Sequence, residues 1–229
     1  MAIEKRSTHS QVVSLLGAGR DHEAARAGVA ELIAQLPDST EGHPMDALTQ
    51  LAQLGPLVGE VVAGITPDQL ALATPCQDFN VRGVLEHMIG GATMFAAAYR
   101  GVEATSPDTE DVLAGFGPAL GDLAAAMSEP GAMQRNVDAP FGTVPGEQFA
   151  RFVVLDGLIH GWDLATATGQ KYSPSAELVG AVTEFAKQAL PPLRDGETFA
   201  AATVAAEDAT PIEHLAALSG RQVTRSSVS

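Results

Sequence analysis

The stretch RFVVLDGLIHGWDLATATGQ, residues 151–170, places polar side chains on a helix face that is otherwise apolar. Its apolar residues recur at intervals of three and four, the period of the buried face of an amphipathic helix. Asp156, His160 and Asp163 lie on that same face. Because burying an unpaired carboxylate is costly, an inward Asp156 needs a partner such as a cation. Residues four apart lie one above the other on a helix, so Asp156 and His160 can bind a single ion.

The composition favours one acidic domain and argues against several classes of partner. The chain has 229 residues, enough for one sizeable core, and its 28 Asp and Glu against 13 Lys and Arg give a formal net charge of -15. This charge repels phosphate backbones and anionic lipids, so we expect neither a nucleic-acid nor a membrane partner. The single cysteine, Cys76, has no internal disulfide partner, and we find no signal segment and no membrane-length apolar run. These features predict a cytoplasmic protein.

Abundant alanine, few aromatic residues and long segments with helical period predict an all-α protein. The expected helices are 45–63, 81–100, 108–127, 151–170, 173–190 and 211–218. Gly115, Gly117 and Pro118 are expected to bend the third of these. The long connection 130–146 suits a crossover between bundle helices, and residues 199–205 are either a loop or a short strand.

Residues 1–44 are predicted to be a helical extension and linker, because two segments of helical period there are followed by the Pro- and Gly-containing stretch 37–44. Residues 45–221 form the predicted bundle, and residues 222–229 a flexible tail. Met45 directly follows the linker, so an alternative start at Met45 is a second interpretation.

A further unusual feature is His87, which has Gly83, Gly90 and Gly91 on its own face of the predicted helix 81–100. Each glycine weakens a helix interior by up to about 1 kcal/mol. Three glycines beside one histidine therefore indicate that space is needed there, for a cavity or a close helix approach.

His87, Asp156 and His160 match a metal site of a helical bundle, provided that their two helices face each other. Three nitrogen and oxygen ligands with one open position are typical of a catalytic zinc site. Nickel, iron and manganese accept the same ligands. Asp163 is expected to support the site by orienting a ligand histidine or by holding a neighbouring arginine. The remaining position is open to water or substrate, so no catalytic residue is assigned.

Purely structural interpretations exist for the same residues. Asp156 could pair with Arg82 or Arg151. His160 and Asp163 could cap or bridge helices, and His87 could be a satisfied core histidine. Cys76 and Trp162 are interpreted as packing residues. We find no Gly-rich phosphate loop, no Gly-x-Ser-x-Gly elbow and no paired-cysteine zinc motif, which excludes those enzyme classes.

Two segments resemble the actinobacterial DinB-like proteins. They are TPCQDFNVRGVLEHMIGG, residues 74–91, and LDGLIHGWDLATATGQ, residues 155–170. More narrowly, the chain is similar to the metal-binding domain of mycothiol-dependent maleylpyruvate isomerase and to its single-domain relatives. The resemblance runs from about Met45 to Arg221.

This resemblance implies a DinB-like four-helix bundle with a long crossover and additional terminal helices. It implies a divalent metal, zinc in the first place, held by His87, Asp156 and His160, although the family's acid is often Glu. It also implies an enzyme of the transferase or isomerase type that uses mycothiol and acts on a small electrophile. The second domain that completes the isomerase site is not expected here, so maleylpyruvate isomerisation is not carried over.

Two rival interpretations remain open at this point. One is a non-catalytic metal-binding helical protein with a structural or stress-associated role, and the other is a module that needs no metal. Exposed alanine-rich helices make a homodimer an additional expectation.

Overall fold

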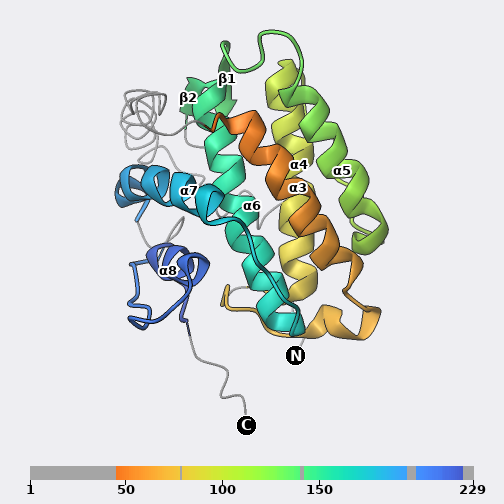
Figure 1. Cartoon of the computed structure of the whole chain (residues 1–229). Coiled ribbons are helices and arrows are strands. Elements are labelled where there is room, and N and C mark those ends of the chain that lie inside the picture. The colour runs from red at the N-terminus through yellow and green to blue at the C-terminus, as the bar shows by residue number, and fades with distance from the viewer. Residues whose placement is uncertain (1–44, 78, 140–141, 195–199, 224–229) are drawn as a thin grey trace, which may run out of the picture.

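The computed structural model describes residues 45–77, 79–139, 142–194 and 200–223, which are mainly helical (Figure 1). The α-helices are α3 (Ala47–Ala63), α4 (Val81–Arg100), α5 (Val112–Met127), α6 (Gly146–Thr168), α7 (Ala176–Ala189) and α8 (Pro211–Leu218). Short 3-10 helices lie at Pro67–Ala71 and Pro191–Leu193. The all-α prediction is confirmed. The predicted helical pair and linker in residues 1–44, and most of the predicted tail, lie outside the described residues.

Side-chain caps decide where the helices begin. Asn80 accepts a hydrogen bond from the Gly83 amide (2.8 Å), so α4 begins at the predicted position. Ser175, not the predicted Ser173, caps α7. The helix α5 begins after Asp111, four residues later than predicted, because Asp111 accepts from two amides of its first turn. Several polar residues precede α5 and α7, and the sequence does not show which of them caps the helix.

The long helices α3 to α6 form a bundle (Figure 1). The N-terminal ends of α3 and α6 meet where the Ala47 amide donates to Glu147 Oε1 (3.2 Å). Their C-terminal ends meet where Gln170 Nε2 donates to the Val61 carbonyl (2.9 Å). These two helices therefore run parallel. Tyr99, near the end of α4, donates to the first carbonyl of α6 (2.7 Å), so α4 runs antiparallel to α6.

The crossover of the bundle is the segment 101–111. Arg100, the last residue of α4, bonds to Asp122 (2.9 Å) and Glu129 (3.0 Å) at the end of α5, which makes α4 and α5 parallel. The chain between them must therefore return along the bundle. The connection 130–146, which the sequence predicts to be the crossover, instead stays at one end, because α5 ends where α6 begins.

That connection carries a small antiparallel hairpin that the sequence does not predict. Strands β1 (Asn136–Ala139) and β2 (Gly142–Pro145) pair with Val137 opposite Val144, and both valines are buried. Two buried valines in strands of four residues are too little alternation to be recognised in a sequence. Residues 200–205, the described part of the ambiguous segment, form neither a strand nor a helix.

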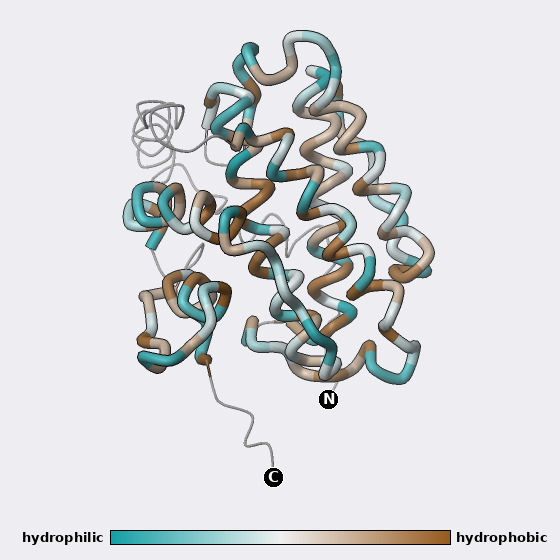
Figure 2. Tube along the Cα trace, viewed as in Figure 1, coloured by the Kyte–Doolittle hydropathy of each residue, from teal (hydrophilic) through white to brown (hydrophobic). Residues whose placement is uncertain are grey.

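A single apolar core joins the bundle to the flanking helices α7 and α8. Its residues follow the inner faces of the helices, as Figure 2 shows by their hydropathy. The helix α5 continues without interruption through Pro118. Among the described residues, no helix is both long enough and apolar enough to span a lipid bilayer.

Candidate metal centre

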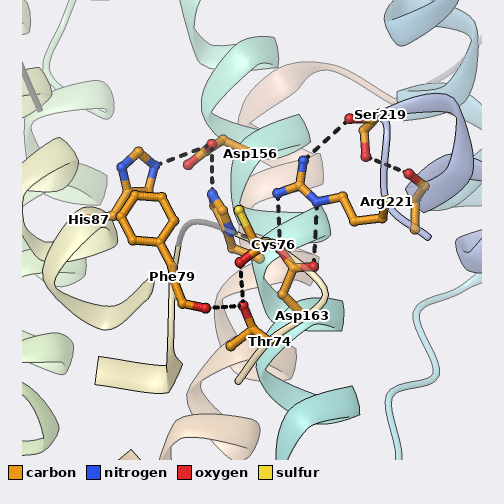
Figure 3. A network of polar contacts seen from close by, with 10 residues as sticks. Thr74, Cys76, Phe79, His87, Asp156, Asp163, Ser219 and Arg221 are labelled. Atoms are coloured by element: carbon orange, nitrogen blue, oxygen red, sulfur yellow. Dashed lines mark hydrogen bonds and ion pairs between the residues drawn. The ribbon is translucent and has the colours of Figure 1, made fainter. Parts of the chain in front are cut away.

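The three predicted ligands come together between α4 and α6. Asp156 Oδ1 lies 3.4 Å from His160 Nε2, one turn further along α6, and 3.6 Å from His87 Nε2 on α4. The two imidazole rings meet edge to face with their centroids 4.9 Å apart. Figure 3 shows Asp156 directed toward His87 across the gap between the helices. The condition that these two helices face each other is therefore met.

The spacing of these atoms suits a shared cation better than direct hydrogen bonds. Charge-assisted hydrogen bonds are about 2.7–2.9 Å long, shorter than both separations around Asp156 Oδ1. Two ligand atoms of a tetrahedral zinc ion lie about 3.3 Å apart when each bond is about 2.0–2.1 Å long. One ligand atom from each of His87, Asp156 and His160 lies within 4.8 Å of the other two. The donor set thus fits a divalent ion with little movement of the helices.

The carboxylates on α6 set the protonation state of the site. Burial alone would lower the pKa of His160, but the nearby carboxylates of Asp156 and Asp163 outweigh burial and raise it to about 9. Burial would raise the pKa of Asp156, but the two histidines hold it well below its usual range. In the absence of metal, His160 is therefore protonated at neutral pH. A metal ion must displace that proton.

Asp163 contacts the ring nitrogen of His160 that points away from Asp156. This nitrogen, Nδ1, lies 3.0 Å from Asp163 Oδ2, and the Asp163 side chain is fully buried. A carboxylate only accepts hydrogen bonds, so Nδ1 carries a proton and Nε2 is the nitrogen left to bind an ion.

The same carboxylate also contacts an arginine, Arg221. Arg221 Nη2 lies 3.0 Å from Asp163 Oδ2 (Figure 3). The backbone of Arg221 is fixed by its amide, which donates to the Ala216 carbonyl of α8, and by the Thr203 hydroxyl, which donates to the Arg221 carbonyl. The C-terminal helix therefore supports the site from behind α6. The sequence contains Arg221 in the segment that resembles the family, but nothing there connects it with Asp163.

The loop before α4 positions His87. The Thr74 hydroxyl contacts the carbonyl oxygens of Cys76 (3.0 Å) and Phe79 (2.7 Å), which closes a tight turn. The Phe79 ring then lies against the His87 imidazole, with 5.6 Å between the ring centroids. His87 Nδ1 is buried and has no hydrogen-bond partner among the described residues. Among the described residues, a carboxylate therefore contacts the Nδ1 atom of His160 but not that of His87.

Cys76 is the residue that sequence reasoning undervalues. Ligand atoms of Cys76, His160 and Asp163 lie within 4.8 Å of one another, so the thiol borders the site. The sequence separates Cys76 from His160 by more than 80 residues. In the sequence, only the position of Cys76 in the turn before the helix that carries His87 indicated that it could lie near the site.

The two arginine pairings considered for Asp156 are not formed, because both arginines pair with other residues. Arg82 pairs with Glu86 (3.4 Å), and Arg151 pairs with Glu147 (3.0 Å). The Glu86 side chain is therefore partly shielded from solvent. The prediction that Trp162 is a packing residue is confirmed, since its side chain belongs to the core.

The glycines near His87 are only partly explained by a need for space. A methyl group on Gly83 would lie 2.9 Å from the Phe79 ring, so Gly83 permits that ring to approach. Gly91 lines a cavity, described below. Gly90 and Gly91 both lie inside α4. Outside the site, His214 is exposed on α8, and the other histidines of the chain, at positions 9, 22 and 43, fall outside the described residues.

A comparison with known proteins shows the family to which this domain belongs. A family model described as "Mycothiol maleylpyruvate isomerase N-terminal domain" matches residues 51–165. The chain belongs to this family. Residues 51–165 contain His87, Asp156, His160 and Asp163, whereas Arg221 lies beyond them. The segment that matches the family therefore contains all three candidate metal ligands.

Two uncharacterized proteins of Mycobacterium tuberculosis are similar to this member of the family over most of its length. They come from the strains CDC 1551 / Oshkosh and H37Rv, and each is 29% identical over 182 residues. The match covers 78% of this chain and 100% of each relative. No solved structure matches the chain significantly. The comparisons thus support a mycothiol-related, metal-binding type of helical domain and establish no specific activity for this chain.

Proposed function

We propose that this protein is a metal- and thiol-dependent enzyme of the transferase or isomerase type, which joins a low-molecular-weight thiol to a small electrophile. The observation that carries the proposal is the spacing of His87 Nε2, Asp156 Oδ1 and His160 Nε2, with separations of 3.6 and 3.4 Å around the carboxylate oxygen. Zinc is the metal we propose, with nickel, iron and manganese as the other candidates.

The three-ligand set leaves one coordination position for a further molecule. A divalent ion held by these three residues would lower the pKa of a thiol or water bound at the open position and would so supply a nucleophile at neutral pH. Mycothiol is the proposed thiol because the description of the matching family names it. The proposed setting is the reducing cytoplasm, where such thiols stay reduced.

The residues of the chain have separate tasks in this scheme. Asp163 holds the His160 ring by its Nδ1 hydrogen, which aims Nε2 at the site. Asp156 supplies the negative charge that partly neutralises the ion. Its side chain is shorter than that of Glu, and the contact of 3.4 Å with His160 keeps the carboxylate close to its own helix.

The decisive experiment measures metal content and affinity. We expect protein purified without added metal, then titrated with zinc in a calorimeter, to bind one equivalent. The variants His87→Ala and His160→Ala should each lose most of this affinity, because each removes one of three ligands. His214→Ala is the matched control, since His214 is exposed and lies outside the site. Substoichiometric binding, or equal affinity in all four proteins, would refute the metal site.

Activity is tested separately from metal binding. Zinc-loaded protein should bind mycothiol in a calorimeter and conjugate it to members of an electrophile panel that contains 2-alkenals, epoxides and activated aryl halides. A metal-loaded protein that does neither would leave the non-catalytic alternative, in which His160→Ala lowers the melting temperature and affects no reaction.

A further inference from the structure

A cavity of about 240 Å³ lies between the four bundle helices. Its outer part is bordered by exposed residues of α3 and α5, among them Ala52, Gly55 and Ala124. Its inner part is bordered by buried residues such as Met88 and Gly91 of α4. The cavity therefore leads from the surface between α3 and α5 toward the middle of the bundle.

The inner part of the cavity reaches the candidate metal centre. Asp156 lines the cavity, and 40% of its side-chain surface is accessible although the residue lies between packed helices. His160, one turn away on the same helix, is only 6% accessible and does not line the cavity. The accessible side of Asp156 therefore faces the cavity. A molecule in the cavity would have one end beside the carboxylate that binds both histidines.

The lining excludes charged and strongly hydrated ligands. Only Ser128 and Asp156 among the lining residues have polar side chains. The Ser128 hydroxyl already donates to the Ala124 carbonyl (2.8 Å), so it is occupied at the rim. All other lining side chains are apolar or absent. A polar group placed in this space would lose its water and find no partner, which opposes binding.

The size of the cavity limits the ligand. An apolar cavity of about 150 Å³ in another protein binds benzene, so a cavity of 240 Å³ has room for roughly ten carbon atoms. A low-molecular-weight thiol with several hydroxyl groups is too polar for such a lining. The apolar part of the second substrate is the better match.

We propose that this cavity binds the apolar portion of the electrophile, an uncharged alkyl or aryl group of roughly ten carbon atoms whose reactive end lies beside Asp156. The reaction of the bound electrophile rests on the proposed function, whereas binding of the apolar group in the cavity does not depend on it. With a 2-alkenal, for example, the thiol sulfur forms a bond to C3 and the thiol hydrogen ends on C2, so no oxidant or reductant is consumed.

The test of binding uses a series of 1-alkanols from butanol to dodecanol, titrated into the full-length chain in a calorimeter. Measurements with EDTA and with zinc separate the cavity from the metal. We expect saturable binding whose dissociation constant falls about fourfold for each added CH₂ group, until about ten carbons, and then stays constant. No saturable binding, or no dependence on chain length, would overturn the proposal.

A matched pair of variants identifies the binding site. Gly55 and Gly59 are one turn apart on α3, and a Cβ at either position would meet nothing within 4 Å, so Leu at either should fold. Only Gly55 lines the cavity. We expect Gly55→Leu to weaken octanol binding at least tenfold and Gly59→Leu to leave it within about twofold. Equal effects of the two variants would place the alkanols elsewhere and contradict the assignment.

The outcome also separates this inference from the proposed function. Alkanol binding without zinc binding or turnover would support the cavity and refute the enzyme, and the reverse result would refute the cavity alone. If the enzyme is active, kcat/KM should rise with the chain length of 2-alkenals, and Gly55→Leu should abolish that rise whereas Gly59→Leu should retain it. A dimer that Gly55→Leu dissociates, combined with no alkanol binding, would assign this surface to a second copy and overturn the proposal.

Discussion

The network around Asp163 gives the sharpest prediction about this protein. Its carboxylate is completely buried and contacts both His160 Nδ1 and Arg221 Nη2 at 3.0 Å. The substitution Asp163→Ala removes the negative charge and leaves the Arg221 guanidinium, which is only 12% accessible, without its partner. The variant also releases the ring of a candidate metal ligand. One substitution should therefore affect both stability and metal affinity.

The expected magnitude follows from burial. Removing one member of a buried ion pair lowers the free energy of unfolding by about 3–5 kcal/mol. For a chain of this length, each kcal/mol corresponds to about 2–4 °C in melting temperature, so the expected decrease is about 6–20 °C. Loss of a residue that orients a ligand histidine lowers metal affinity by about 10- to 100-fold. Asp163→Asn keeps the shape and one acceptor, so its effects should be smaller.

The assay compares thermal unfolding in EDTA with calorimetric zinc titration of the folded proteins. Asp122→Ala is the control, because Asp122 also pairs with an arginine, Arg100, at 2.9 Å but is 57% accessible. Exposed ion pairs contribute little, so this variant should unfold and bind zinc almost as the wild type does. Similar melting temperatures for Asp163→Ala and Asp122→Ala would refute the argument from burial. An unchanged zinc affinity of Asp163→Ala would refute its role in orienting His160.

Three further predictions concern protons, packing and the first residues of the chain. Without metal, the pKa of His160 is raised to about 9, so protonation of His160 adds about 3 kcal/mol to the free energy of unfolding. This contribution is complete below about pH 6.5 and is lost as pH rises toward 9. Over this pH range the melting temperature in EDTA should fall for the wild type and should fall less for His160→Asn. The zinc affinity of the wild type should increase over the same range. Gly146→Ala should lower the free energy of unfolding by about 1–3 kcal/mol, because the new methyl group would overlap the Ala132 carbonyl, while Gly59→Ala should raise it slightly. A chain that begins at Met45 should unfold cooperatively, as circular dichroism can show, and failure to fold would assign residues 1–44 to the core.

The local chemistry of this protein could be predicted from its sequence. The period of residues 151–170 fixed Asp156, His160 and Asp163 on the buried face of one helix, because side chains four apart always lie on the same side of a helix. The cap Asn80 likewise set the start of α4 and with it the orientation of His87. These features depend only on neighbouring residues.

Features that depend on distant contacts were predicted poorly. The sequence assigned the crossover to 130–146, but α4 and α5 run parallel, as the contact of Arg100 with Asp122 shows, and this arrangement requires the crossover at 101–111. The length of a connection limits which ends it can join and does not choose between them. The hairpin at 136–145 was missed for a similar reason, since its two buried valines gain their core position only from the helices around them.

The sequence by itself determined which residue types were available for a metal centre and which helix faces carried them. Only the tertiary structure decided that α4 and α6 face each other closely enough to put Asp156 Oδ1 within 3.6 Å of both histidines. It also brought Arg221 to the buried carboxylate from 58 residues away and opened the cavity that reaches Asp156. The physical reason is that helix periodicity is a local property of the backbone, whereas the distance between helices is set by packing of the whole core.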